Sequence, residues 1–528
     1  MTDAVTSPVD GEIAPALPAA RTQSRTLKVM ILASGEFLST LVNLGSLAVL
    51  ARVLTIDDYA TYRQTILAFF FAVPLLTLGL PQALYYFLPT EHRRPRAVLL
   101  ENLLMLAGMG LIFSIFLLAG GGKLLAMRFN NPGLERTLIL FAPYPLLIMP
   151  ALGLAACLMA RGQVRAVAVY HLFSRLVTGS LIIGAVLLWR SAPGAIIANV
   201  AAAGVVLVPA LWLMLRATRG GQTSLPTPSG MWEQTKFAVP LGLTNVLATL
   251  SMSLDKVVVA SMCSPEDFAI YANGAMEIPL IGVVTGSIMA VLLPDIRRLR
   301  VEGKNHEALD LWKRGAAKSA LIILPIMCFL FFMAPDVMTV LYSPKYAASA
   351  LPFRLYLLLL PFRVITFGVM VMAAGKSKLL LYRSATALLV NLALSMLLVH
   401  LLGYIGAAIA VIVTFCAWSV PYFVVVIGRL YQARPATVLP YKTILAILGV
   451  SALGCVGCVP TLLMSGSASV LRLSLAIPLY AAIVVALMMR LSLLKPVAIR
   501  AAVNRVLRSR GAGTPGRQIG EREYENRA

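Results

Sequence analysis

The sequence predicts an all-α polytopic membrane protein with about 14 transmembrane helices. Hydrophobic residues make up 59% of the 528 residues, charged residues only 13%, and the mean hydropathy is +0.85. A soluble domain has about 25% charged residues. Apolar runs of about 20 residues, long enough to cross a bilayer core, recur along the chain. Because lipid cannot hydrogen-bond exposed backbone groups, these spans are expected to be helical.

The predicted spans form two groups of six and a final pair. The first group lies before a polar linker, the second group after it, and the pair follows a second basic linker. In order, the spans are expected at 29–50, 65–87, 98–118, 138–160, 166–189, 195–215, 237–262, 271–293, 319–341, 351–373, 384–402, 407–427, 443–464 and 473–489.

The two groups of six are expected to be repeats of one unit. The run Asp58–Tyr62 (Asp-Tyr-Ala-Thr-Tyr), in a polar turn expected at 54–63, returns 209 residues later as Asp267–Tyr271 (Asp-Phe-Ala-Ile-Tyr). Six spans separate the two runs, so both halves have the same orientation and form parallel repeats. The fourth span of each half also contains proline, which predicts a bend in that helix.

These patterns divide the chain into six parts. The two six-helix lobes are separated by a cytoplasmic linker, and each end of the chain carries a tail. The expected parts are a disordered N-terminus (1–26), the N-terminal lobe (27–216), the linker (217–236), the C-terminal lobe (237–428), helices 13 and 14 (429–491) and a basic cytoplasmic tail (492–528).

Positive charge predicts the orientation. With the N-terminus in the cytoplasm, cytoplasmic segments hold 34 Lys and Arg residues, counting Arg175 among them, and outer loops hold eight. This bias predicts a multi-pass protein of the inner (plasma) membrane with both termini in the cytoplasm. It also explains the net charge of +23 as a topology signal attracted to anionic lipids, rather than as a nucleic-acid site. Residues 494–510 are expected to form a basic amphipathic helix on the inner surface.

The loops contain no pattern typical of an enzyme. No outer loop exceeds about twenty residues, which is too short for a folded catalytic domain. The four histidines are scattered, and Cys455 and Cys458 have no second pair of ligands. We therefore expect a transporter rather than an enzyme, with no cofactor and no metal site.

Cationic residues inside or beside the spans are the candidate substrate-binding residues. A charge at the bilayer centre costs about 2.5–3.5 kcal/mol, so such groups usually face a cavity or a partner. Arg363 lies deepest and is expected in a cavity, whereas Lys256 and Arg354 fit either a cavity or ion pairs with nearby acids. Arg52 and Arg63 are expected at the outer rim of the cavity.

Acidic residues inside the spans are the candidates for ion coupling. These are Glu36 in the first span, Asp255 in the seventh and Glu277 in the eighth. Glu36 fits a coupling cation or a helix–helix contact, and Asp255 or Glu277 fits an ion pair with Lys256 or Arg354. The acids of the two repeated turns, Asp57, Asp58, Glu266 and Asp267, are expected to cap helices. Glu101 is expected to be solvated near the inner surface.

The N-terminal stretch resembles a known transporter family. The resemblance is carried by Ala51–Leu54 (Ala-Arg-Val-Leu), Asp58–Tyr62, Leu78–Leu84 (Leu-Gly-Leu-Pro-Gln-Ala-Leu) and Phe87–Pro89. These runs resemble the polysaccharide-biosynthesis and lipid-linked oligosaccharide (Wzx-like) flippases of the multidrug/oligosaccharidyl-lipid/polysaccharide (MOP) exporter superfamily. Ala60 stands where the family usually has glycine. The motifs cover residues 30–95, and the topology extends the resemblance to about residue 430.

The resemblance implies two six-helix bundles around a central cavity. It also implies translocation of an anionic lipid-linked oligosaccharide, commonly a polyprenyl-pyrophosphate glycan, from the inner to the outer leaflet by alternating access. Candidate partners are this lipid-linked glycan, anionic membrane lipids, and polysaccharide polymerase and assembly proteins. The alternatives are a peptidoglycan lipid-precursor flippase and a cation-coupled multidrug exporter. A membrane glycosyltransferase or ligase is the least favoured alternative.

Overall fold

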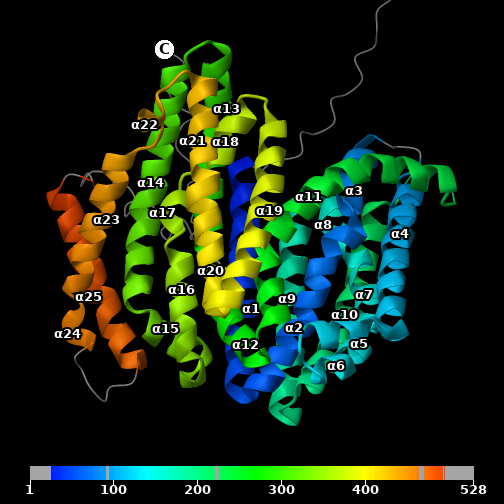
Figure 1. Ribbon diagram of the computed structural model, residues 1–528. Coiled ribbons are helices and arrows are strands. Elements are labelled where there is room, and N and C mark those ends of the chain that lie inside the picture. The colour runs from blue at the N-terminus through cyan, green and yellow to red at the C-terminus, as the bar shows by residue number, and fades with distance from the viewer. Residues whose placement is uncertain are drawn as a thin grey trace, which may run out of the picture.

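The computed structural model describes residues 25–90, 94–220, 225–276, 278–462, 469–491 and 493. Within these ranges the chain is helical almost throughout and contains no strand. Figure 1 shows two groups of helices side by side, with α1 between them and the last helices at one edge. This arrangement agrees with the predicted all-α membrane fold.

The first half of the chain comprises ten α-helices and two short irregular turns. The elements are α1 (Arg25–Val53), α2 (Ile56–Thr77), α3 (Leu80–Thr90), α4 (Pro95–Phe116), the π-helical turn η1 (Leu117–Gly121), α5 (Gly122–Arg128), α6 (Gly133–Phe141), α7 (Pro143–Ile148), the 3₁₀ turn η2 (Pro150–Gly153), α8 (Leu154–Ala160), α9 (Val164–Trp189) and α10 (Ala192–Ala217).

The second half and the C-terminal helices follow in the same manner. The elements are α11 (Pro228–Met262), α12 (Pro265–Gly274), α13 (Pro279–Val301), α14 (Asn305–Phe332), α15 (Ala334–Tyr342), η3 (Pro344–Ser349), α16 (Ala350–Leu357), α17 (Leu360–Arg363), α18 (Phe367–Ala373), α19 (Ser377–Leu402), α20 (Tyr404–Val413), η4 (Thr414–Ser419), α21 (Val420–Tyr431), α22 (Pro435–Val438), α23 (Tyr441–Val456), α24 (Val459–Leu462) and α25 (Ser469–Arg490).

Among the described residues, 10 helices are long and apolar enough to cross a membrane, or up to 12 if each bent pair is one span. The predicted number of 14 is therefore not confirmed. The two predicted spans outside this count are 29–50 and 271–293. In the first, α1 contributes a shorter apolar helix, Phe37–Val53. In the second, the chain breaks between α12 and α13.

The repeated motif forms the same structure in both halves. Thr55 caps α2 by accepting a hydrogen bond from the Asp58 main-chain N–H at 3.1 Å, and Ser264 caps α12 through Asp267 at the same distance. The acids of these turns therefore lie in the first turns of helices, as expected. The expected polar turn at 54–63 was drawn too long, because α2 begins at Ile56.

The fourth span of each half is broken, as its prolines predicted. The first is divided into α6, α7, η2 and α8, and the second into η3, α16, α17 and α18. Proline lacks the N–H that a helix interior needs. Pro143 and Pro150 each lie in the first turn of a new segment in the first half, and Pro361 does so in the second.

The linker between the halves is shorter than expected, and most of both tails lies outside the described residues. The expected linker at 217–236 is helical from Pro228, where α11 begins. The N-terminal residues 1–24 and the predicted amphipathic helix at 494–510 lie outside the described residues.

We call the end of the bundle with the α1–α2 turn the outer end and the opposite end the inner end, following the expected orientation. In Figure 1 the outer end is at the bottom.

The last helices attach to the second half. α23 packs against α14, and α25 against α15. The Tyr480 hydroxyl donates to the Pro325 main-chain oxygen at 2.9 Å, and Arg472 forms an ion pair with the buried Asp336 at 3.4 Å. These contacts place α23–α25 beside the repeated units, at one edge of the bundle (Figure 1).

Candidate functional site

A cavity lined by both apolar and polar side chains lies inside the second half. Its volume is about 470 Å³, and its walls come from α11, α13, α16, α17, α19, α20 and η4. The wall includes small polar side chains such as Ser251, Thr285, Asn391 and Thr414. A polar cavity among apolar spans is the arrangement expected where a membrane protein binds a hydrophilic group.

Arg363 lies on the wall of this cavity. It is the last residue of α17, at the break in the fourth span of the second half, and its side chain is half-buried. The guanidinium lies over the Phe415 ring, 5.9 Å from its centroid. Because the break at Pro361 makes α17 a short helix that ends beside the cavity, its last residue, Arg363, lies on the cavity wall.

Arg383 also lies on the wall and was missed by the sequence prediction. It had been assigned to a cytoplasmic loop, because the predicted span began at Ser384. The helix begins at Ser377, so Arg383 lies six residues inside it. Its guanidinium lies over Phe423, 5.3 Å from the centroid, and donates to the Ser384 hydroxyl at 3.0 Å. The signal in the sequence was Lys376 and Lys378, which supply the positive charge at the actual helix end.

Arg354 and Lys256 are not on this wall. Arg354 donates to the main-chain oxygens of Phe331, at 2.9 Å, and Phe332, at 3.5 Å, where α14 ends. It thus caps a helix C-terminus, where a cation is favourable. Lys256 is half-buried on α11, one residue after Asp255, and is outside the cavity lining.

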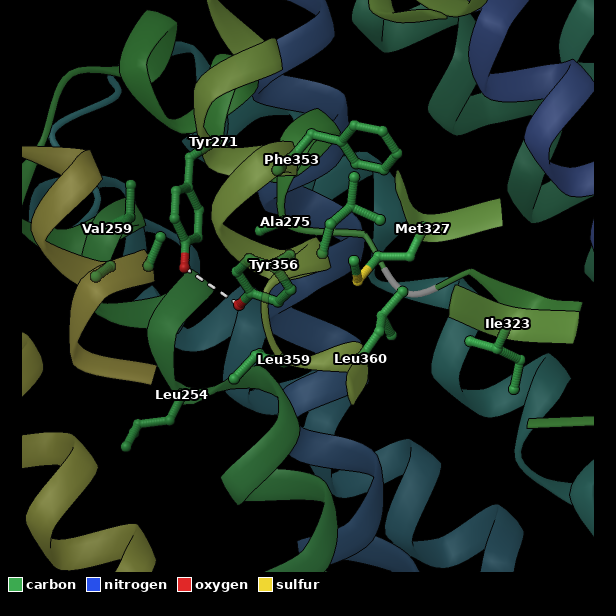
Figure 2. Packing of buried hydrophobic residues seen from close by; sticks show 14 of the residues in the cluster. Leu254, Val259, Tyr271, Ala275, Ile323, Met327, Phe353, Tyr356, Leu359 and Leu360 are labelled. Atoms are coloured by element: carbon green, nitrogen blue, oxygen red, sulfur yellow. Dashed lines mark hydrogen bonds between the residues drawn. The ribbon is translucent and has the colours of Figure 1, made fainter. Parts of the chain in front are cut away.

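Asp255 is bound by two tyrosines. Its side chain is 1% exposed, and one carboxylate oxygen, Oδ2, accepts hydrogen bonds from the hydroxyls of Tyr271, at 2.6 Å, and Tyr356. Figure 2 shows these two tyrosines directed toward each other, and their hydroxyl oxygens are 3.3 Å apart. Tyr356 also lines the cavity, so Asp255 lies directly behind the cavity wall. The side chain of Glu36, and Glu277 as a whole, lie outside the described residues.

The outer end joins the two halves through Arg63. Its guanidinium donates to the Ala272 main-chain oxygen at 3.1 Å and to the Tyr59 hydroxyl at 3.0 Å. The Tyr59 hydroxyl in turn donates to the Asn273 side-chain oxygen at 2.6 Å. Arg63 was expected at a cavity rim, but it bonds the first half (α2) to the second (α12).

Arg52 makes a similar contact at the same end. It donates to the main-chain oxygen of Val340 in α15, and Lys345 donates to the main-chain oxygen of Leu54 at 3.4 Å. Arg52 was also expected at the cavity rim. The structure places it in the outer contact between the halves.

The inner end joins the halves through Glu101, which is fully buried rather than solvated as expected. Glu101 accepts hydrogen bonds from the Thr227 main-chain N–H at 2.9 Å, the Thr227 hydroxyl at 3.1 Å and the Gln234 amide at 3.1 Å. Arg94 forms an ion pair with it at 3.8 Å. The sequence offered no signal for this burial, because the hydrogen-bond donors Thr227 and Gln234 lie more than 120 residues away.

The bend between α2 and α3 adds a second inner contact. The two helices meet at 41°, with Leu78 and Gly79 at φ values of 41° and 81°. Gly242 of α11 packs directly on this bend, and a Cβ at Gly242 would overlap the Leu78 carbonyl group. The two halves are thus joined by direct contacts at both ends of the bundle.

In the part of the chain that the structure describes, no group of three or more His, Cys, Asp or Glu residues could hold a metal ion. The two cysteines of the Cys455–Cys458 pair point to main-chain oxygens instead. Cys455 lies 3.4 Å from the Cys328 oxygen, and Cys458 lies 3.8 Å from the Ala476 oxygen.

The family model described as "Polysaccharide biosynthesis protein" matches residues 49–351, which is more than half of the chain. This chain belongs to the polysaccharide biosynthesis protein family. The matched region of this family member runs from the end of α1 to the start of α16, so it includes both copies of the repeated motif. No curated protein matches the sequence.

Solved structures share the fold of this polysaccharide biosynthesis protein. The lipid II flippase MurJ, in an inward closed conformation, is similar with a TM-score of 0.68 and 14% identity over 88% of this chain and 99% of that one. A multidrug resistance MATE transporter of the MOP superfamily, in an inward-facing conformation, has a TM-score of 0.58 and 16% identity over 76% of this chain and 99% of that one. A MOP superfamily transporter from Pyrococcus furiosus has a TM-score of 0.54 and 15% identity over 77% of this chain and 96% of that one. These likenesses establish the MOP transporter fold.

Proposed function

We propose that this protein is a flippase, not an enzyme. It translocates an anionic lipid-linked oligosaccharide, a polyprenyl-diphosphate glycan, from the inner to the outer leaflet of the inner membrane for surface polysaccharide synthesis. The single observation that carries the proposal is the polar cavity whose wall holds Arg363 and Arg383. Membership of the polysaccharide biosynthesis family and the MOP fold support it.

The chemistry of the cavity suits a phosphate head group. A diphosphate cannot cross the hydrocarbon unaided, because each unpaired charge there is costly. A guanidinium binds phosphate oxygens through two parallel hydrogen bonds, and the cavity offers two guanidinium groups. A volume of about 470 Å³ is within the usual range for a small-molecule site. The polyprenyl tail stays in the bilayer while the head group crosses.

Alternating access explains the two sets of contacts between the halves. The outer contact through Arg63 and Asn273 and the inner contact through Glu101 and Thr227 both join the first half to the second. Opening a path between the halves to one side of the membrane requires the contacts between the halves at that side to break. Parallel repeats that rock against each other around a central site work in this way.

A peptidoglycan lipid-precursor flippase is the second candidate, favoured by the fold similarity to the lipid II flippase MurJ. Its substrate also carries a diphosphate, so the two functions differ in the glycan rather than in the cavity chemistry. A cation-coupled multidrug exporter is the third, favoured by the similarity to MATE transporters. The two cavity arginines disfavour cationic drugs because like charges repel.

Lipid extraction from cells that lack this gene tests the proposal. We expect full-length lipid-linked oligosaccharide to accumulate on the inner leaflet, with loss of surface polysaccharide and restoration by the wild-type gene. Accumulation of the peptidoglycan precursor would identify the second candidate instead. Normal precursors together with greater sensitivity to cationic drugs would overturn the flippase proposal.

A further inference from the structure

Arg175 lies inside the first half, at a depth where a cation is costly. It is eleven residues beyond the start of α9, which at 1.5 Å per residue is about 16 Å along the helix. The sequence prediction had counted it with the cytoplasmic residues. Among the described residues no carboxylate forms an ion pair with it. An arginine at this depth is expected to face a partner or a polar space.

The helix periodicity shows that Arg175 does not lie on the lipid side of α9. The exposed apolar residues Val169, Phe173 and Leu176 recur at four- and three-residue spacing and form one face. Arg175 falls on a different face, in line with Gly179 and Ile182 at i+4 and i+7. That face packs against α1, because a Cβ at Gly179 would lie 2.7 Å from the Ser46 hydroxyl oxygen.

A small polar crevice accompanies Arg175 on this face. A cavity of about 30 Å³ lies among α1, α2 and α9. Polar side chains form about half of its lining, namely Asn43, Ser46, Tyr62, Arg175 and Thr178, and the rest is formed by Leu47, Leu50, Gly179 and Ile182. The side chains of Arg175 and Asn43 are both exposed, although they lie beside the tight contact between α1 and α9. The face is therefore open to polar groups at the level of Arg175.

The position of α1 suggests where this crevice leads. α1 packs against α9 in the first half and against α13 and α15 in the second. Figure 1 shows α1 between the two groups of helices. The crevice is lined by residues of the first half alone and adjoins α1, the helix that contacts both halves. In an alternating-access transporter of parallel repeats, the head group passes between the halves.

We propose that Arg175 binds a phosphate group of the lipid-linked substrate from the first half, with Asn43 and Thr178 as its polar neighbours. This inference rests on the proposed function and adds a residue that acts from the opposite half to Arg363 and Arg383. A head group held from both halves stabilises them in one arrangement. The planar guanidinium of arginine can donate two parallel hydrogen bonds to a phosphate, whereas the ammonium of lysine supplies the charge without this paired geometry.

Binding of a polyprenyl diphosphate to the purified full-length protein tests the inference, with an uncharged polyprenol of equal chain length as the reference ligand. We expect Arg175→Gln to weaken diphosphate binding ten-fold or more, because a charge-assisted hydrogen bond is lost. Arg175→Lys should retain more affinity than Arg175→Gln. The matched control is Arg165→Gln, in the first turn of α9, which should bind as the wild type does. Polyprenol binding should be equal in all variants.

The outcomes separate this inference from the proposed function. Wild-type protein that binds the diphosphate no better than polyprenol would refute the proposed function itself. Wild-type discrimination with unchanged affinity in Arg175→Gln would overturn only the role of Arg175. Equal loss of both ligands would assign Arg175 a structural role and also overturn the inference.

A labelling experiment keeps the inference testable if Arg175→Gln does not fold. Asn43→Cys places a thiol beside an intact Arg175, and labelling of the parent protein gives the background from its six cysteines. We expect the polyprenyl diphosphate to slow labelling of the introduced thiol several-fold, and polyprenol to leave the rate unchanged. Equal labelling rates with both lipids would refute a phosphate site at this position.

Discussion

Glu101 of α4 accepts two hydrogen bonds from Thr227, one from its main-chain N–H at 2.9 Å and one from its hydroxyl at 3.1 Å. Thr227 is the N-cap residue of α11, so a buried carboxylate of the first half binds the N-terminus of the helix that opens the second. An anion is favourable at a helix N-terminus. The start of α11 is thereby bound to α4, although the sequence placed Thr227 in a polar cytoplasmic linker.

Glu101→Ala should weaken the inner contact and lower stability. The substitution removes the acceptor of the half-buried Thr227 donors and one of the two acceptors of the buried Gln234 amide. A buried donor left without a partner costs about 1–3 kcal/mol. We expect a lower thermal midpoint of the purified protein, by several degrees, and a smaller loss for Glu101→Gln. The matched control is Asp310→Ala, whose side chain is exposed and forms only a surface pair with Lys313. An unchanged midpoint in Glu101→Ala would contradict the assignment.

Tyr59→Phe should loosen the outer contact. The Tyr59 hydroxyl is the common member of the contact, since it accepts from Arg63 and donates to Asn273. Its removal takes away the hydrogen bond from Tyr59 to Asn273 and keeps the aromatic ring, while Arg63 still donates to the Ala272 main-chain oxygen. We expect faster hydrogen exchange of the backbone amides in 56–63 and 265–274, measured by mass spectrometry.

The control for this measurement is Tyr441→Phe, because Tyr441 is exposed at the first turn of α23. Its exchange in the two outer segments should match the wild type. Equal exchange in Tyr59→Phe and the wild type would show that the outer contact does not depend on this hydroxyl.

Much of the fold follows from the sequence. Most spans are long apolar runs whose length is set by bilayer thickness, so their positions and order are visible without tertiary information. Their number is not, because 10 to 12 candidate spans are found among the described residues where 14 were predicted. The repeated runs at Asp58 and Asp267 are local capping motifs, so each half forms them independently. The exact helix ends are less predictable. α19 begins at Ser377 and α2 at Ile56, so both helices extend beyond the apolar runs that predicted the spans, and α2 begins at its Thr55 cap.

The candidate site was only partly predictable for a related reason. Arg363 was identified because it stands alone within an apolar run. Arg383 lies within about a turn or two of Lys376 and Lys378 and was assigned to a cytoplasmic loop, although it lies within α19. Arg175 was counted with the cytoplasmic charges, although it lies eleven residues inside α9. The roles of Arg52, Arg63 and Glu101 were predicted only from their expected depth in the membrane. Their partners in the second half are 126 or more residues away in the sequence, so only the tertiary structure shows that they join the halves.

Asp255→Asn should separate substrate binding from ion coupling. The carboxylate lies behind the cavity wall and is bound by two tyrosine hydroxyls, whereas an amide cannot take up a proton or hold a cation as a carboxylate does. We expect the variant to bind a polyprenyl diphosphate as the wild type does, but to translocate it equally with and without an ion gradient across proteoliposomes. A variant that still responds to the gradient would exclude Asp255 as the coupling residue.

Arginine substitutions should separate the cavity from its surroundings. Arg363→Gln and Arg383→Gln each remove a cation from the cavity wall, and loss of a charge-assisted hydrogen bond costs about 1.5–3 kcal/mol, or roughly ten- to a hundred-fold in affinity. We expect both variants to insert in the membrane but to fail to restore surface polysaccharide in cells that lack the gene. Arg354→Gln instead removes a cap from α14, so it should lower the thermal midpoint while largely retaining transport. The contrast depends on location rather than charge, because all three residues are arginines in the fourth and fifth spans of the second half. Transport that fails only in Arg354→Gln would place the anion site outside this cavity.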